Sequence, residues 1–234
     1  MIEVKKHRSK ILLGIAILFV SCSTVERDNF YDKGGINYMG GSGSGQIIYG
    51  EPVEYGGETY ETVVIGTQTW MARNLNYVTG NSKCNNDNPA NCAIYGRLYD
   101  WAAMMALSPS CNSSNNFDVC IPSAIHRGIC PSGWHIPSTD EWDTLEGFVG
   151  SSNAGTKLKA SSGWEHYGNG TDNYGFAALP GGSDNNNSIV GSDIGTIGVW
   201  WTAQAFSVRT MSYNEESVYH YGRYGKGSVR CLKD

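Results

Sequence analysis

The side chains best suited to contacting a ligand lie after Ser161, where the composition turns to glycine, asparagine and aromatic residues. Flat aromatic faces can stack on sugar rings, and amides and carboxylates can exchange hydrogen bonds with sugar hydroxyl groups. These residue types together predict a ligand-binding surface built from loops. The candidate residues are Trp164, His166, Tyr167, Asn169, Asp172, Trp200, Tyr221 and Tyr224.

Burial in a core is the alternative for the tryptophans, because large aromatic side chains supply much of a domain's apolar area. The sequence leaves core packing and ligand contact equally open for Trp164 and Trp200. Side chains alternate along a strand, so we expect only one of Trp200 and Trp201 to point inward. The tryptophans expected in the core are Trp70, Trp101, Trp134, Trp142 and Trp201.

Metal binding and catalysis have weaker support in the sequence. Cys130 with His135, or His166 with Asp172, could be imagined as metal ligands, but these spacings match no zinc motif. The aspartates and asparagines of the loops offer oxygen atoms to calcium, yet such residues more often form turns. No nucleophile elbow, phosphate-binding loop or metalloprotease motif is present. We therefore expect no metal, no cofactor and no enzymatic activity.

The chain contains seven cysteines, of which Cys22 lies near the N-terminus and the other six lie between residues 84 and 231. An even number of cysteines in an exported chain predicts three disulfides, for which fifteen pairings exist. We expect the cysteines that are close neighbours within polar loops to pair with each other, so the remaining two cysteines form the third disulfide. The predicted disulfides are Cys84–Cys92, Cys111–Cys120 and Cys130–Cys231. The last closes the longest loop and should stabilise most.

The stretch Cys130–Trp142 is expected to hold these loops in place. Ser138 and Glu141 have the spacing of a capping box, which predicts the start of a helix. Apolar residues then recur every three to four positions up to Gly150, which predicts one buried helix face. That face would contain Trp142, Leu145, Phe148 and Val149.

Short elements are predicted elsewhere along the chain. Residues 60–65 and 69–71 have the pattern of a hairpin, and Asp100 could cap a helix over residues 101–107. A turn or two of helix is predicted over residues 154–160. Strands predicted at 199–203, 206–209 and 227–231 would close an antiparallel sheet beside the N-terminal strands. These elements indicate an α+β fold with long disulfide-linked loops.

The N-terminus has the features of an export signal. Four basic residues precede a ten-residue apolar run, Ile11–Val20, which is too short to span a bilayer. A small residue before Cys22 is typical of a lipoprotein signal, in which the cysteine is lipidated and becomes the first residue. Ordinary cleavage without lipid is the alternative. We therefore expect a signal peptide over residues 1–21, a flexible glycine- and serine-rich tether over 22–57, and a domain over 58–234.

The charge of the chain limits its partners. Removal of residues 1–21 would take away four of 17 basic and one of 22 acidic residues, which leaves a net charge of −8. Such an acidic protein is poorly suited to nucleic acids or anionic membrane surfaces. Attachment to the membrane would come from the N-terminal lipid alone.

Five blocks in order resemble the Fibrobacter succinogenes major paralogous domain family, and the resemblance covers about residues 57–234. The blocks are Ile65–Tyr77, Tyr95–Tyr99, Cys130–Trp142, Gly175–Gly182 and Ser228–Cys231. The resemblance implies an irregular C-type-lectin-like fold, distantly similar to that of the sulfatase-modifying factors. It also implies an exported, frequently lipid-anchored protein, but no defined activity.

Three functions follow as expectations. The first is a non-catalytic adhesion module, anchored by lipid to the outer membrane and displayed at the cell surface, with a glycan or a surface protein as its ligand. The second is a structural protein of the envelope or of an appendage that binds other proteins. The third is a cysteine-oxidising enzyme of the sulfatase-modifying type, which would need a free thiol or a reactive thiol pair.

Overall fold

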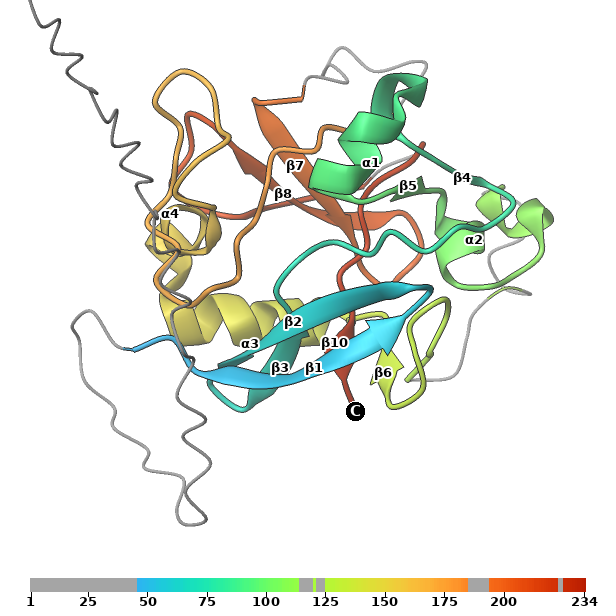
Figure 1. Cartoon of the computed structure of the whole chain (residues 1–234), viewed down its shortest axis with the longest axis horizontal. Coiled ribbons are helices and arrows are strands. Elements are labelled where there is room, and N and C mark those ends of the chain that lie inside the picture. Colours follow the sequence, from blue (N-terminus) through green and yellow to red (C-terminus); the bar gives the residue numbers. More distant parts are fainter. Residues whose placement is uncertain (1–45, 114–119, 121–124, 185–193, 223–224) are drawn as a thin grey trace, which may run out of the picture. The chain divides into compact units, whose positions relative to one another are not determined.

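The computed structural model describes residues 46–113, 120, 125–184, 194–222 and 225–234, whose path is drawn in colour in Figure 1. The predicted signal peptide, Cys22, the tether up to residue 45 and Tyr224 lie outside these residues. All described residues belong to a single compact unit. Within them, no helix combines the length and apolarity needed to cross a membrane.

Short strands and helices alternate along the chain, with long connections between them. The strands are β1 (Tyr49–Tyr55), β2 (Glu58–Ile65), β3 (Gln68–Met71), β4 (Ser82–Lys83), β5 (Leu98–Tyr99), β6 (Trp134–His135), β7 (Ile197–Trp201), β8 (Ser207–Ser212), β9 (Tyr219–Gly222) and β10 (Leu232–Lys233). The α-helices are α1 (Pro89–Tyr95), α2 (Trp101–Met104), α3 (Thr139–Val149) and α4 (Ala154–Leu158), and the 3₁₀ helices are η1 (Asn85–Asp87), η2 (Pro109–Asn112) and η4 (Ser151–Asn153). This mixture confirms the α+β class.

The first sheet joins the two ends of the domain. Among the described residues it contains five strands in the order β1-β2-β3-β10-β6, and every neighbouring pair is antiparallel. The predicted hairpin is confirmed as β2 and β3, with Gly66 at a φ of 63° in the turn, a value that favours glycine. Leu232 of β10 pairs with Trp70 on one side and His135 on the other. Figure 1 shows the C-terminus beside β6 and β10.

Strand β1 corrects the expected tether. Residues 49–55 pair with β2 across an irregularity between Gly50 and Val53, so they belong to the folded domain. The strand was missed because Gly50, Val53 and Tyr55 are only partly buried and its other residues are exposed, so it carries little apolar signal. Tyr55 stacks on Tyr77, with 4.7 Å between the ring centres.

The second sheet is separate from the first, contrary to the prediction of one closing sheet. Strands β7, β8 and β9 form it, in that order among the described residues. The predicted strands at 199–203 and 206–209 correspond to β7 and β8, but the third strand falls at Leu232–Lys233 and joins the first sheet. Strand β9 was not predicted, since its four residues are all exposed and show no alternation of burial.

Both tryptophans of β7 are buried, so the expectation that only one points inward is wrong. The side chains of Val199 and Trp201 belong to one apolar cluster, and that of Trp200 belongs to a second. A sheet with core on both faces buries both alternating sets of side chains. The five tryptophans predicted to lie in the core are confirmed as buried: Trp70, Trp101, Trp134, Trp142 and Trp201.

Helix α3 begins as predicted, at a capping box between Ser138 and Glu141. The prediction that Phe148 is buried was wrong, since its side chain is 54% exposed. At about 100° per residue, Phe148 lies about 120° around the helix from Trp142, whereas Glu146 lies within the buried stripe. The indole rings of Trp142 and Trp70 are 5.0 Å apart, which packs α3 on the first sheet, as Figure 1 shows.

The other local predictions agree with the structure. Asp100 caps α2 by accepting a hydrogen bond from the backbone N–H of Ala103, although this helix ends at Met104 rather than at residue 107. The helical turn predicted after residue 154 is α4. All three predicted disulfides are confirmed: Cys84–Cys92, Cys111–Cys120 and Cys130–Cys231.

Candidate functional site

Trp164 and Trp200 are buried, so of the two alternatives left open for them core packing is the one that the structure has, and both are removed from the candidate ligand contacts. The indole N–H of Trp164 donates to the carbonyl oxygen of Ala178 at 2.9 Å, and that of Trp200 donates to Asn74 Oδ1 at 2.7 Å. Both side chains are buried in the same apolar cluster. Their polar atoms and their ring faces are therefore already used within the fold.

Asn169 and Asp172 shape the loop that covers Trp164. Asn169 Oδ1 accepts from the backbone N–H of Trp164 at 2.9 Å, and Asp172 Oδ1 accepts from that of Ala177 at 2.8 Å. Burial raises the pKa of Asp172, while the bond from Ala177 and the charge of Arg230 act in the opposite direction. One oxygen of each side chain is therefore already bonded to a backbone donor of the loop.

His166 and Tyr167 are exposed at the surface of the same loop. Tyr167 is fully exposed, at 102% of its reference area, and the ring of His166 lies 5.0 Å from that of Tyr213. Both His166 and Tyr167 have positive φ angles, which are uncommon outside glycine. They are accessible to a ligand, but no contact in the described structure joins them to the other candidates.

Tyr221 lies on β9 and forms an exposed aromatic surface with Tyr219, which we call the tyrosine strip. The two rings are 6.2 Å apart with an angle of 18° between their planes, and they are 39% and 56% exposed for Tyr219 and Tyr221. The hydroxyl group of Tyr219 donates to Glu215 Oε2 at 2.9 Å, which raises the pKa of Tyr219. The strip therefore offers two nearly parallel ring faces on a strand, with one ring held by a hydrogen bond.

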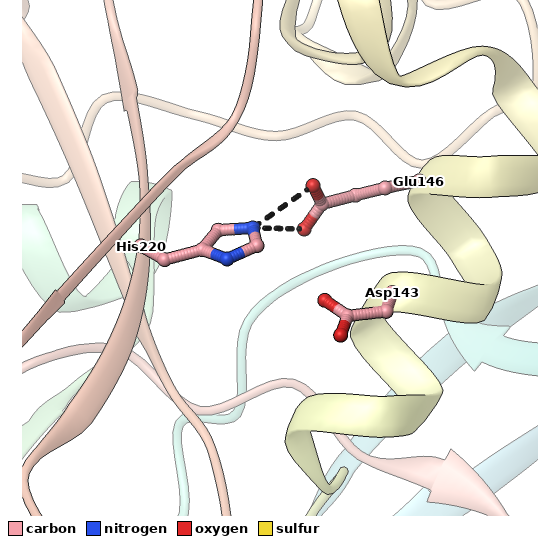
Figure 2. A group of neighbouring side chains, drawn as sticks. All are labelled: Asp143, Glu146 and His220. Carbon is pink, nitrogen blue, oxygen red and sulfur yellow. Dashed lines mark hydrogen bonds and ion pairs between the residues drawn. The ribbon is translucent and has the colours of Figure 1, made fainter.

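His220, between the two tyrosines, points to the opposite face of β9. Figure 2 shows its ring directed at the carboxylate of Glu146 on α3, with Asp143 one turn away on the same helix. The distances from His220 Nε2 to the two oxygens of Glu146 are 3.2 and 3.1 Å. Asp143, Glu146 and His220 each place one possible metal ligand within 4.8 Å of the others.

Arg209 of β8 already supplies a cation to this cluster. Its Nε donates to Glu146 at 3.0 Å and its terminal nitrogen donates to Asp143 at 2.7 Å and to the carbonyl oxygen of Thr139 at 3.1 Å. A metal bound by both carboxylates would have to share them with a guanidinium group that is only 2% exposed. The geometry therefore favours a buried ion pair that joins β8 and β9 to α3.

The sequence-based reasoning missed this cluster. One local feature of the sequence could have indicated the cluster: helical spacing places the charged residue Glu146 in the buried stripe of α3. A buried carboxylate requires a cationic or hydrogen-bonding partner. That requirement pointed to an arginine or histidine from another element, although it could not identify which one.

All six cysteines of the domain are held in disulfides. No thiol is therefore available on these residues in the described structure. A cysteine-oxidising mechanism of the predicted third type would have to begin with a disulfide that opens.

The chain matches no curated protein and no solved structure. Residues 63–233 match the Fibrobacter succinogenes major domain, which is most of the 234-residue chain and agrees with the five sequence blocks. The protein belongs to the Fibrobacter succinogenes major domain family.

Proposed function

We propose that the protein is a non-catalytic binding module, exported, anchored to the outer membrane by a lipid on Cys22 and displayed at the cell surface, where it binds a glycan. The export and anchoring rest on the N-terminal sequence. The observation that supports glycan binding is the tyrosine strip of Tyr219 and Tyr221.

The tyrosine strip has the properties that sugar recognition needs. Tyrosine supplies a broad apolar face together with a hydroxyl group, and it loses little conformational entropy when it is already held. The two rings are nearly parallel, with 6.2 Å between their centres, and both are exposed, so a sugar ring could pack on the aromatic surface that they present together. Glu215, which holds Tyr219, adds carboxylate oxygens that can accept from sugar hydroxyl groups.

We also propose that the α+β fold is C-type-lectin-like. Two features support this: β10 lies between β3 and β6 and so joins the two ends of the domain in one sheet, and long disulfide-linked loops lie between the elements. A fold of this type does not define a ligand. The ligand must be found through the site.

A glycan array and a cellulose pull-down test the proposal. Wild-type protein is expected to retain at least one polysaccharide, and the Tyr219→Ala/Tyr221→Ala variant is expected to lose it, because each stacked ring contributes about 0.5–1.5 kcal/mol. Tyr49→Ala is a matched control, since Tyr49 is an exposed tyrosine on β1 in the other sheet. Equal retention of wild type and the double variant on every glycan would exclude the tyrosine strip as the site.

Binding to another protein is the second candidate, and the position of β9 favours it. This strand pairs only with β8 in the described structure, so its outer edge can add a strand from a partner. Cross-linking on intact cells separates the candidates. A single protein neighbour captured in stoichiometric amount would favour the structural role over glycan binding.

The enzyme candidate requires a thiol, and the disulfides oppose it. Titration of the native domain with a thiol reagent is expected to find none on Cys84, Cys92, Cys111, Cys120, Cys130 or Cys231. One or more reactive thiols among these six would restore the enzymatic hypothesis.

A further inference from the structure

We propose that the protein has a second binding site, for a carboxylate-bearing sugar, in a hollow between the β1–β2 turn and α1. The hollow has a volume of about 670 Å³, within the range of about 300–1,000 Å³ that is usual for small-molecule sites. Its lining includes Glu58, Thr59, Arg73, Asn76, Val78 and Arg97. We call it the arginine hollow. It shares no residue with the tyrosine strip, so this proposal goes beyond the proposed function.

The arginine hollow is positive within an acidic protein. Two guanidinium groups and one carboxylate line it, whereas the whole chain has a formal net charge of −5. Arg73 forms an ion pair with Glu58, which leaves the charge of Arg97 without a carboxylate partner among the described residues. An anion entering the hollow would therefore meet one unit of unpaired positive charge.

Arg97 is held in a fixed position without a carboxylate partner in the described structure. Its Nε donates to Ser82 Oγ at 2.9 Å and one terminal nitrogen donates to the carbonyl oxygen of Ser82 at 3.2 Å. The other terminal nitrogen lies 3.8 and 3.7 Å from the sulfur atoms of Cys84 and Cys92. Neutral partners position the guanidinium group but do not neutralise it, so it is pre-organised for an external anion.

Arg73 and Asn76 carry two further unused polar atoms. Arg73 Nε and Asn76 Oδ1 are sheltered from solvent and lack a hydrogen-bond partner in the described part of the chain. The amide group of Asn76 is correctly oriented, because its Nδ2 donates to Glu58 Oε1 at 2.6 Å. The side chain of Arg73 is 43% exposed and lines the hollow, so its guanidinium group is accessible to a ligand oxygen.

This combination fits a sugar acid better than a simple anion. The two arginines provide donors for a carboxylate, while Glu58 and Thr59 provide acceptors for hydroxyl groups. Val78, together with Pro89 and Ala93, supplies apolar surface for the carbon skeleton of the ring. Inorganic anions bring no carbon skeleton for this apolar surface and no spaced array of hydroxyl groups for these acceptors. We therefore assign the arginine hollow to a uronic acid unit of an acidic polysaccharide.

Calorimetric titration of the purified full-length protein, in mild detergent, with digalacturonic acid tests this assignment. Binding is expected, and the dimethyl ester of the same disaccharide should bind at least about tenfold more weakly, because it keeps the shape and loses the charge. Arg97→Gln should weaken binding of the acid by a similar factor. Lys233→Gln removes an exposed positive charge on β10 and should leave binding unchanged.

The ester comparison uses the unaltered protein, so it decides the question even if Arg97→Gln does not fold. Equal binding of the acid and its ester, or no binding of the acid, would overturn the proposal. Equal or tighter binding of inorganic phosphate, or of a dipeptide with a free C-terminus, would overturn the assignment to a sugar. The Tyr219→Ala/Tyr221→Ala variant should still bind the acid, which separates this site from the tyrosine strip.

Discussion

Substitution of Asn74 should destabilise the domain far more than its place in a polar stretch of sequence indicates. Its Oδ1 accepts from Trp200 Nε1 at 2.7 Å and from two nitrogens of Arg230 at 2.8 and 3.2 Å. Its Nδ2 donates to the carbonyl oxygen of Tyr95 at 2.9 Å. One amide group thus joins β7, the segment before β10 and the end of α1.

The loss of unfolding free energy in Asn74→Ala follows from the buried donors that would lose their acceptor. The N–H of Trp200 would lose its partner in a fully buried position, at about 1–3 kcal/mol. Arg230, also buried, would lose two bonds but keep its contact with the carbonyl oxygen of Phe176 and its position 4.2 Å over the Phe176 ring. The total is about 3–5 kcal/mol, a large part of the ~5–15 kcal/mol by which a domain is stable.

Asn74→Asp is the matched control, because it keeps an acceptor oxygen at the position of Oδ1 and replaces the N–H₂ donor to Tyr95 by a second oxygen. Burial lowers the pKa of Arg230 to about 9 despite the nearby charge of Asp172, and a carboxylate at position 74 would support its charged form. The aspartate variant should therefore lose less than half as much stability as the alanine variant. Asn169→Ala, which removes a single bond to the backbone at the surface, should cost about 0.5–1.5 kcal/mol.

Urea unfolding at neutral pH with intact disulfides measures these differences. Asn74→Ala should shift the midpoint without a change in slope, and the melting temperature should fall by roughly 6–20 °C. A loss below about 1 kcal/mol, or an aspartate variant as unstable as the alanine variant, would refute the argument that Asn74 Oδ1 satisfies buried donors.

Three further predictions concern the ion pairs and disulfides. Burial opposes protonation of His135, but hydrogen bonds to Glu141 and Asp234 outweigh it and raise its pKa. The folded state therefore gains stability that is complete below the unfolded pKa and is lost as pH rises through the raised value. The stability difference between wild type and His135→Gln in urea titrations should accordingly shrink as the pH rises above the ordinary histidine pKa of about 6.5. Cys130→Ser/Cys231→Ser should cost up to ~4.7 kcal/mol and Cys84→Ser/Cys92→Ser up to ~2.5 kcal/mol by loop entropy, and a reversed order in thermal unfolding would contradict this. Glu146→Gln should weaken the ion pair with Arg209 and lower the melting temperature of the domain. Added zinc should leave the melting temperature of the wild type unchanged. A rise with zinc would show that Asp143, Glu146 and His220 bind the metal in spite of Arg209.

Features with local signals were predictable from the sequence. The capping box of α3, the hairpin of β2 and β3, and the Asp100 cap each depend on residues within a few positions of one another. The two short disulfides depend on separations of only 8 and 9 residues, and the long one followed by elimination. For all of these except the long disulfide the local sequence was sufficient, because few alternatives exist over such short distances.

The candidate site was less predictable, because burial depends on contacts between distant segments. Trp164 lies in a loop whose composition is that of exposed loops, yet its ring is covered through contacts that its neighbours in sequence do not reveal. Trp200 is buried because a core lies on each side of β7, which no alternation pattern can indicate. Tyr221 was a candidate from the sequence, but its strand, and with it the neighbouring ring of Tyr219, became evident only from the pairing with β8.

The cluster of Asp143, Glu146 and His220 fixes the position of the tyrosine strip, because His220 lies on the same strand, β9, as the two tyrosines. An edge strand of four exposed residues has little apolar surface to hold it in place, and such strands tend to fray. His220 instead contacts Glu146, whose carboxylate is also bound by the buried Arg209 of β8, while Lys159 donates to the carbonyl oxygens of Ser212 and Glu215 in the β8–β9 turn. Because side chains alternate along a strand, fixing His220 toward α3 directs Tyr219 and Tyr221 to the other face. The ion pair that could be mistaken for a metal site is therefore the structural reason that two tyrosines can be held exposed and parallel.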